Sequence, residues 1–232
     1  MPPWTVLDTA QIPGGGGELK LSRRADEFSI RLSGIRGELM NSRMHGSEEA
    51  LAELGCAHLR SVADASVLVG GLGMGFTLAA ALRTVAPSAQ VTVAELIPAV
   101  VEWNQGPLGD CAGHPLQDAR TRLHVGDVAA LLADRRQAFD AVLLDVDNGP
   151  EGLTHKDNQW LYSLAGLEAI YHSLRPEGVL AVWSAGPCSL FTIRLKKVRF
   201  NVSLHSVRAR KGKGAHHTIW LAQRPWRARH RT

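Results

Sequence analysis

The stretch from Val67 to Gly75, VLVGGLGMG, constrains this chain more than any other. Its β-branched, apolar start predicts a strand, and the apolar spacing of the following FTLAAALRTV predicts a helix. Between the two lie the glycines Gly70, Gly71, Gly73 and Gly75. Glycine permits positive φ and close approach of the backbone to a ligand, and a helix start offers free N–H groups. The stretch therefore predicts a nucleotide-binding turn, with these glycines as candidate cofactor-binding residues.

The glycine spacing narrows the choice of nucleotide. The dinucleotide motif G-x-G-x-x-G would need glycine at position 76 or 78, where Phe76 and Leu78 stand, and no G-K-[ST] follows for a P-loop. A second predicted strand, VTVAE at 91–95, ends in Glu95. A carboxylate at the tip of that strand reaches the ribose of a nucleotide bound over the first turn. The combination disfavours NAD and ATP and resembles the S-adenosylmethionine site of class I methyltransferases and their relatives.

The rest of the chain continues the alternation of strand and helix. Strands are predicted at 122–125, 139–145 and 179–185, and helices at 128–133, 159–174 and 188–198. Segments 202–207 and 217–222 are too close for a helical crossover and should form an antiparallel hairpin at the sheet edge. We expect an α/β fold, a doubly wound and mostly parallel sheet of class I methyltransferase type with a C-terminal antiparallel hairpin.

The N-terminal part has a different pattern. Residues 1–17 hold three prolines and a run of four glycines and should be loose, whereas 18–40 alternate like two or three short antiparallel strands. A helix should follow, capped by Ser47. We therefore expect a small N-terminal β appendage with a linking helix at 1–60, a nucleotide-binding transferase domain at 61–225, and a basic tail at 226–232.

Acidic residues follow several predicted strands, at the edge where a bound cofactor would lie. Asp127 follows the third strand, where it could accept a hydrogen bond from an adenine amino group or cap the helix that begins at Val128. Asp145 ends the fourth strand, and the turn after it adds Asp147 and Glu151. Clustered carboxylates suit a cationic acceptor. Asp145 is our candidate catalytic base, because partial burial raises the pKa of a carboxyl group.

These motifs support a family resemblance. The glycine stretch, Glu95, Gly126–Asp127, the run FDAVLLDVDNGPEGL and the segment RMHGSEEALAEL resemble spermidine synthases and spermidine-synthase-like proteins over roughly residues 30–225. The resemblance implies a polyamine-type aminopropyltransferase fold and activity, with S-adenosylmethionine or its decarboxylated form as donor and a small amine as acceptor.

The resemblance also implies roles for individual residues. Asp145 would deprotonate or orient the attacking amine, and Asp147 would be the second aspartate close behind it. Glu95 would hold the ribose and Asp127 the adenine. His45 and Glu48 stand near a His-Glu or Gln-Glu pair of the family and are candidate substrate-binding residues.

One departure from the family pattern keeps other functions open. Spermidine synthases carry an aspartate in the glycine loop that helps hold the donor's amine, and the aligned residue here is Gly73. A methyltransferase that acts on a small molecule or on RNA is therefore an alternative to the aminopropyltransferase. A non-catalytic cofactor-binding module is a second alternative.

Composition adds expectations about surroundings and partners. Three cysteines without C-x-x-C spacing and scattered histidines predict neither disulfides nor a metal site, and the start lacks signal-peptide features, so we expect a cytoplasmic protein with no membrane contact. The adjacent His216 and His217 should point to opposite faces of a strand. Trp103 could line the adenine or acceptor pocket. Residues 194–232 contain twelve Lys or Arg and no acid, which suits either a solvated face or RNA. A homodimer is a further expectation.

Overall fold

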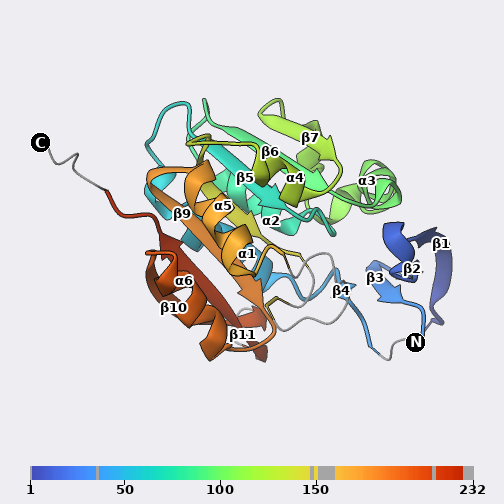
Figure 1. The fold of residues 1–232 in the computed structure, drawn as a ribbon. Coiled ribbons are helices and arrows are strands. Elements are labelled where there is room, and N and C mark those ends of the chain that lie inside the picture. The colour runs from blue at the N-terminus through green and yellow to red at the C-terminus, as the bar shows by residue number, and fades with distance from the viewer. Residues whose placement is uncertain (1, 35–36, 147–148, 151–159, 211–212, 227–232) are drawn as a thin grey trace, which may run out of the picture.

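We describe a computed structural model of the chain, covering all residues except 1, 35–36, 147–148, 151–159, 211–212 and 227–232. Its main sheet has seven strands in the order β10-β11-β9-β8-β5-β6-β7 (Figure 1). The strands are β5 (Ser66–Gly70), β6 (Gln90–Glu95), β7 (Thr121–Val125), β8 (Phe139–Leu144), β9 (Leu174–Ser184), β10 (Asn201–Arg210) and β11 (Lys213–Gln223). β5 to β9 pair in parallel, and β11 and β10 close one edge in antiparallel. The predicted fold class and hairpin are confirmed.

Helices cover both faces of this sheet because alternate strand residues point to opposite sides. Val67 and Val69 of β5 face one core cluster, whereas Leu68 between them faces the other. The first cluster includes buried residues of α1 (Gly46–Gly55), α2 (Phe76–Thr84) and α3 (Pro98–Gln105). The second includes residues of α4 (Val128–Ala133), α5 (Leu164–Ser173) and α6 (Ser189–Lys197). The sheet is therefore doubly wound.

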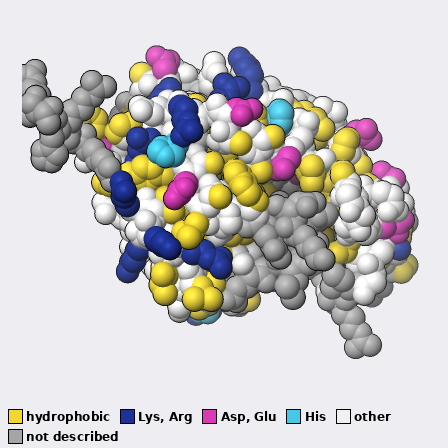
Figure 2. Space-filling model, in the orientation of Figure 1, with side chains coloured by type: hydrophobic (Ala, Val, Ile, Leu, Met, Phe, Trp, Pro, Cys, Tyr) yellow, Lys and Arg dark blue, Asp and Glu magenta, His cyan; other side chains and the backbone are white. Residues whose placement is uncertain are grey.

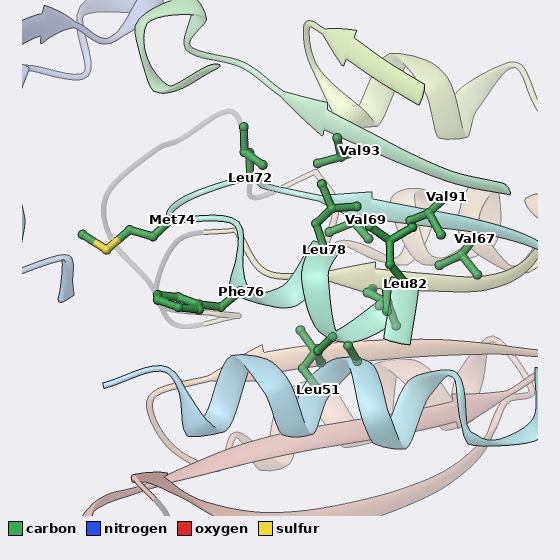
Figure 3. Packing of buried hydrophobic residues seen from close by; sticks show 14 of the residues in the cluster. Leu51, Val67, Val69, Leu72, Met74, Phe76, Leu78, Leu82, Val91 and Val93 are labelled. Carbon is green, nitrogen blue, oxygen red and sulfur yellow. The ribbon is translucent and has the colours of Figure 1, made fainter. Parts of the chain in front are cut away.

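The first face has two helical layers near its centre. Leu78 and Leu82 of α2 lie against the valines of β5 and β6, and Leu51 of α1 lies on the other side of α2 (Figure 3). Met74 and Phe76, at the start of α2, project away from these valines (Figure 3). Both side chains are buried members of the same core cluster, and both also line the space beyond the strand ends.

The N-terminal strands form a second sheet, in the order β1-β2-β3-β4. Its strands are β1 (Thr5–Gln11), β2 (Glu18–Arg24), β3 (Glu27–Leu32) and β4 (Met40–Asn41). The expectation that residues 1–17 are loose is wrong, because β1 pairs with β2 in antiparallel. The indole N–H of Trp103 on α3 donates to Asp8 of β1 over 2.7 Å, and the sheet lies beside α3 (Figure 1). Trp103 thus joins the two sheets instead of lining a pocket.

Two further predictions differ from the structure in detail. The helix predicted at 159–174 is shorter, because α5 begins at Leu164 after the capping Ser163, whose hydroxyl accepts from the Gly166 N–H. The strand predicted at 179–185 begins earlier, because β9 starts at Leu174. Its pairing with β8 is interrupted between Leu174 and Val179, and Glu177 in that interval has φ +68°.

Basic side chains gather around α6. Its last turn carries Arg194, Lys196 and Lys197, and the space-filling view shows Lys and Arg side chains at the lower left, where α6 lies (Figure 2). Leu190 and Ile193 are exposed on the same helix. Among the described helices, none is both long and apolar enough to cross a membrane.

Candidate active site

A cavity of about 420 Å³ lies beyond the carboxyl ends of β5, β6 and β8. In this sheet β5 lies between β6 and β8, so the chain extends the sheet first on one side of β5 and then on the other. Open α/β sheets bind ligands at such a switch point, beyond the carboxyl ends of the strands. The N-terminal sheet supplies the opposite wall. Polar and glycine residues of the wall include Glu38, Glu48, Gly71, Gly73, Thr77, Glu95, Asp127, Asp145 and His217.

The glycine loop forms one side of this cavity. Gly70 ends β5, and Gly75 stands before the first residue of α2. Gly71 has φ +89°, and a Cβ on it would collide with the carbonyl oxygen of Asp145. Gly73 has φ +53°, and a Cβ there would lie 2.9 Å from the Met40 sulfur. The loop therefore needs glycine at 71 both for its conformation and for close contact with the end of β8.

Glu95 lies at the end of β6, as predicted, and lines the cavity. Its carboxylate accepts the Leu72 N–H over 2.9 Å and the Ile97 N–H over 2.8 Å. Burial raises the pKa of Glu95 above its usual value, and these backbone hydrogen bonds oppose the rise. Each carboxylate oxygen has a further lone pair, so Glu95 can hold the glycine loop and still accept from a ligand hydroxyl.

Glu95→Ala is expected to weaken binding of an adenosyl ligand by about 1.5–3 kcal/mol, the usual cost of losing a hydrogen bond to a charged group. Calorimetric titration with methylthioadenosine measures this. Glu102→Ala, an exposed position on neighbouring α3, is the matched control. Equal affinity in the two variants would remove the ribose role from Glu95.

Asp127 caps α4, which is one of the two roles that the sequence predicts for it. Its carboxylate accepts the Ala129 N–H over 2.8 Å at the start of α4. It also lines the cavity. The helix cap uses only Oδ1 of Asp127. Its other oxygen could accept a hydrogen bond from an adenine amino group, and this role stays a prediction.

Asp145 lies directly after β8, and its N–H donates to Gly70 over 2.9 Å, so it faces the glycine loop. The Thr77 hydroxyl donates to its carboxylate over 2.5 Å. Burial raises the pKa of Asp145 to about 6, and the Thr77 hydrogen bond opposes that rise. An aspartate with these properties is suited to accept a proton near neutral pH.

Glu48 of α1 lines the same cavity. Burial first, and then the negative charge of Asp145, raise the pKa of Glu48 to about 7, whereas a hydrogen bond from Ser47 lowers it. The negative charge of Asp145 disfavours ionisation of Glu48, so near neutral pH the two carboxyl groups together tend to keep one proton.

The raised pKa of Glu48 predicts a pH-dependent stability. The folded state binds a proton that the unfolded chain releases above its ordinary pKa of 4.5, so stability falls as pH rises from there through about 7. Glu48→Gln should lose less stability over this pH range. Its free energy of unfolding at pH 8 should therefore exceed that of the parent by about 1–3 kcal/mol. Denaturant unfolding across pH measures it, with Glu53→Gln, exposed on the same helix, as control. Parallel pH profiles for Glu48→Gln and the parent would contradict the prediction.

Other predicted site residues have different positions. The His45 ring stacks on Phe76, with 4.2 Å between centroids, and its Nδ1 lies 3.5 Å from the Glu49 carboxylate. His45 is the residue before α1, where the cap was expected at Ser47, so the expected Ser47 cap is wrong. Asp147 and Glu151 lie outside the described residues.

Several residues of the site carried no recognisable signal in the sequence. Thr77 is one of many helix residues, and its role depends on Asp145, 68 positions away. Met40 fills the space beside Gly73. His216 and His217 do point to opposite faces: His217 reaches Ser47, whereas His216 reaches Ser206 on the neighbouring strand. The sequence predicted that alternation but not which histidine turns inward.

Comparison with known proteins agrees with this geometry. The family model described as the spermine/spermidine synthase domain matches residues 44–198. No curated protein matches the chain.

The described residues do not form a metal site. Among them, no three His, Cys, Asp or Glu side chains lie close enough together to hold a metal ion.

Several solved structures have the same fold. Spermidine synthase from Thermotoga maritima gives a TM-score of 0.75 at 18% identity, covering 94% of this chain and 72% of that one. A spermidine synthase in complex with the transition state analogue AdoDATO gives 0.72 at 17% identity, covering 94% and 72%. A probable spermidine synthase from Corynebacterium glutamicum ATCC 13032 gives 0.65 at 12% identity, covering 100% and 84%.

Proposed function

The chain belongs to the spermine/spermidine synthase family, and on that premise we propose that it transfers an aminopropyl group from decarboxylated S-adenosylmethionine to an amine held in the cavity. The observation that carries the proposal is the position of Asp145, which lies against the glycine loop and accepts the Thr77 hydroxyl. A family member of this kind is a transferase, so the non-catalytic alternative is not proposed.

The proposed reaction assigns a task to each part of the site. The glycine loop and Glu95 hold the nucleoside, and Asp127 is available at the adenine end. Asp145 removes a proton from the acceptor's ammonium group, and the freed lone pair attacks the donor carbon bonded to sulfur. The carbon–sulfur bond breaks, and its electrons leave the sulfonium as a neutral thioether. The protein supplies position and a base, while the sulfonium supplies the reactivity.

Several features support an amine acceptor. Glu48 and Asp145 line the cavity beside the loop, and Glu38 adds a further carboxylate on the wall formed by the N-terminal sheet. Carboxylates attract and orient a cationic substrate. A solved spermidine synthase of the same fold binds the transition state analogue AdoDATO, which makes the decarboxylated donor the first to test.

Methyl transfer from intact S-adenosylmethionine is the second candidate, and Gly73 favours it. The family's loop aspartate is missing there, and the Met40 thioether lies beside Gly73. An apolar side chain at this point offers no partner to the ammonium of an aminopropyl donor. No observation on the described part of the chain supports RNA contact or a homodimer.

Product analysis tests the proposal. The purified chain is incubated with each donor and a panel of diamines and polyamines, and the nucleoside product is identified by mass spectrometry. Methylthioadenosine together with an aminopropylated amine is the expected result. S-adenosylhomocysteine with a methylated acceptor would replace the proposal with the second candidate, and no product from either donor would overturn both.

A further inference from the structure

The side chain of Asp145 meets a single hydroxyl group. Thr77 Oγ1 lies 2.5 Å from Asp145 Oδ2, and the same hydroxyl oxygen lies 3.4 Å from the main-chain oxygen of Glu48 on α1. Thr77 is the second residue of α2, and it is only 2% exposed. Two helices and the end of β8 therefore come together at this hydroxyl.

The two contacts of the Thr77 hydroxyl compete for one hydrogen. A threonine hydroxyl has a single hydrogen to donate, and an ionised carboxylate can only accept. The contact of 2.5 Å has the length of a charge-assisted hydrogen bond, whereas 3.4 Å is long for a hydroxyl donor. The hydrogen therefore lies between Thr77 and Oδ2 of Asp145. Among the described residues, no other donor contacts this carboxylate.

The main chain of Asp145 is fixed without help from Thr77. Its N–H donates to Gly70 over 2.9 Å, and its carbonyl oxygen lies so close to Gly71 that a Cβ there would collide with it. The side-chain torsions are the freedom that remains, and the contact with Thr77 restricts them. Threonine is itself stiff, because a β-branched side chain has few χ1 rotamers in a helix.

A single neutral donor suits a carboxylate that has to act as a base. Burial raises the pKa of Asp145, the Thr77 hydrogen bond lowers it, and the balance is a pKa of about 6. Without a donor, a buried carboxyl group would stay protonated at neutral pH. With a Lys or Arg partner it would be ionised but too weak a base. On the described part of the chain, neither residue type pairs with Asp145.

We propose that Thr77 is the positioning residue of the base: its hydroxyl holds Oδ2 of Asp145 and leaves Oδ1 to take the proton of the acceptor. This inference rests on the proposed function. The acceptor's ammonium nitrogen gives one proton to Oδ1, and its lone pair then attacks the donor carbon, while the Thr77 hydrogen stays on Thr77. Asp145 is half-buried and lines the cavity, so water can take the proton from Oδ1 after the products have left.

Other titratable groups share the cavity with Asp145. The described ones on its wall are Glu38, Glu48, Glu95, Asp127 and His217. The charge of Asp145 raises the pKa of Glu48 in particular. A substitution at Thr77 leaves all these groups in place, so a change in the titration of Asp145 reports the loss of the hydroxyl.

The kinetic test separates the hydroxyl of Thr77 from its methyl group. Thr77→Val keeps the volume and removes the donor, whereas Thr77→Ser keeps the donor and removes the methyl group. In Thr77→Val the ionised form of Asp145 loses its partner, so the acidic limb of kcat/KM for the acceptor should move up by about one pH unit. At pH 6, kcat/KM should fall about fivefold, and at pH 9 it should change little. Thr77→Ser should follow the parent at every pH.

Thr84→Val is the matched control. Thr84 is the last residue of the same helix, and its hydroxyl donates to Ala80 over 2.8 Å. This variant should keep the pH profile of the parent. A parent-like profile in Thr77→Val would overturn the inference. An impaired Thr77→Ser beside a normal Thr77→Val would overturn it too, because that order is expected if Thr77 only fills space.

Carbon NMR of the Asp145 carboxyl group measures the same shift without turnover. Its signal is identified by its absence from Asp145→Asn. The pKa of Asp145 should be about one unit higher in Thr77→Val than in the parent and unchanged in Thr77→Ser. Thr77→Cys, whose thiol is a weaker donor, should show a smaller rise, and it keeps the test open if the valine variant does not fold.

The two measurements together distinguish this inference from the proposed function. An unchanged pKa of Asp145 in the valine and cysteine variants of an active aminopropyltransferase would overturn the role of Thr77 alone. The expected rise in a chain that turns over neither donor would support the Thr77 contact and reject the proposed function alone.

Discussion

Replacing Asp145 by Asn is expected to lower kcat about 100-fold or more, the typical cost of losing a general base. Asn keeps the shape of the side chain and an oxygen that can accept the Thr77 hydroxyl, which donates to Asp145 over 2.5 Å. It cannot take a proton. Nucleoside affinity should change little, because Glu95 and the glycine loop remain intact. Steady-state kinetics with saturating donor and titration with methylthioadenosine measure the two effects separately.

The control for this experiment is Asp134→Asn. Asp134 is exposed at the end of α4, so its loss of charge changes the net charge of the protein without touching the cavity. Full activity in Asp145→Asn would reject Asp145 as the base. A fall in nucleoside affinity as large as the fall in kcat would mean that Asp145 mainly shapes the glycine loop.

Gly73→Asp is expected to change the preference between donors about 100-fold in favour of decarboxylated S-adenosylmethionine. A carboxylate at 73 offers the aminopropyl ammonium a charge-assisted partner and repels the carboxylate of the intact donor, and each effect contributes about 1.5 kcal/mol. The position tolerates the change, since φ is +53° and Asp adopts that region more readily than most residues. The nearby Met40 sulfur belongs to a flexible side chain that can shift.

Gly73→Asn is the matched control, because it has the same size and conformational tolerance without the charge. Titration of both variants with each donor gives the ratio of affinities. Equal ratios in Gly73→Asp and Gly73→Asn would show that the loop does not contact the donor's amine. A preference that moves toward the intact donor would contradict the assumed orientation of its tail.

The two main carboxylates of the site could be predicted, because the end of a strand is recognised from the local sequence pattern. Glu95 and Asp145 each terminate an apolar strand, and parallel strands bring their carboxyl ends to one edge. β1 could not be predicted in this way. Its side chains are almost all exposed, so it lacks the alternation that marks a half-buried strand. What holds it is pairing with β2 and the contact from Trp103, both tertiary.

The polar partners of the site illustrate the same limit. A Ser followed by two glutamates is a normal helix start, and the local pattern favours Ser47 as the cap. In the structure Ser47 instead contacts His217, which lies 170 positions later. No local pattern carries information about a partner so distant. The role of Glu48, which depends on the charge of Asp145, is hidden for the same reason.

The position of α1 has a consequence for how the protein is made. This helix is synthesised before any strand of the main sheet, yet it packs against β9, β10 and β11, the last strands of the chain. Gly46 lies so close to β10 that a Cβ there would approach the backbone of Ala209. During synthesis α1 can pack against α2 early, but its contacts with β9, β10 and β11 must wait until nearly the full chain has been made. The glycine loop and Glu95 can assemble early, whereas the wall that carries His217 is completed only when the C-terminal hairpin has emerged.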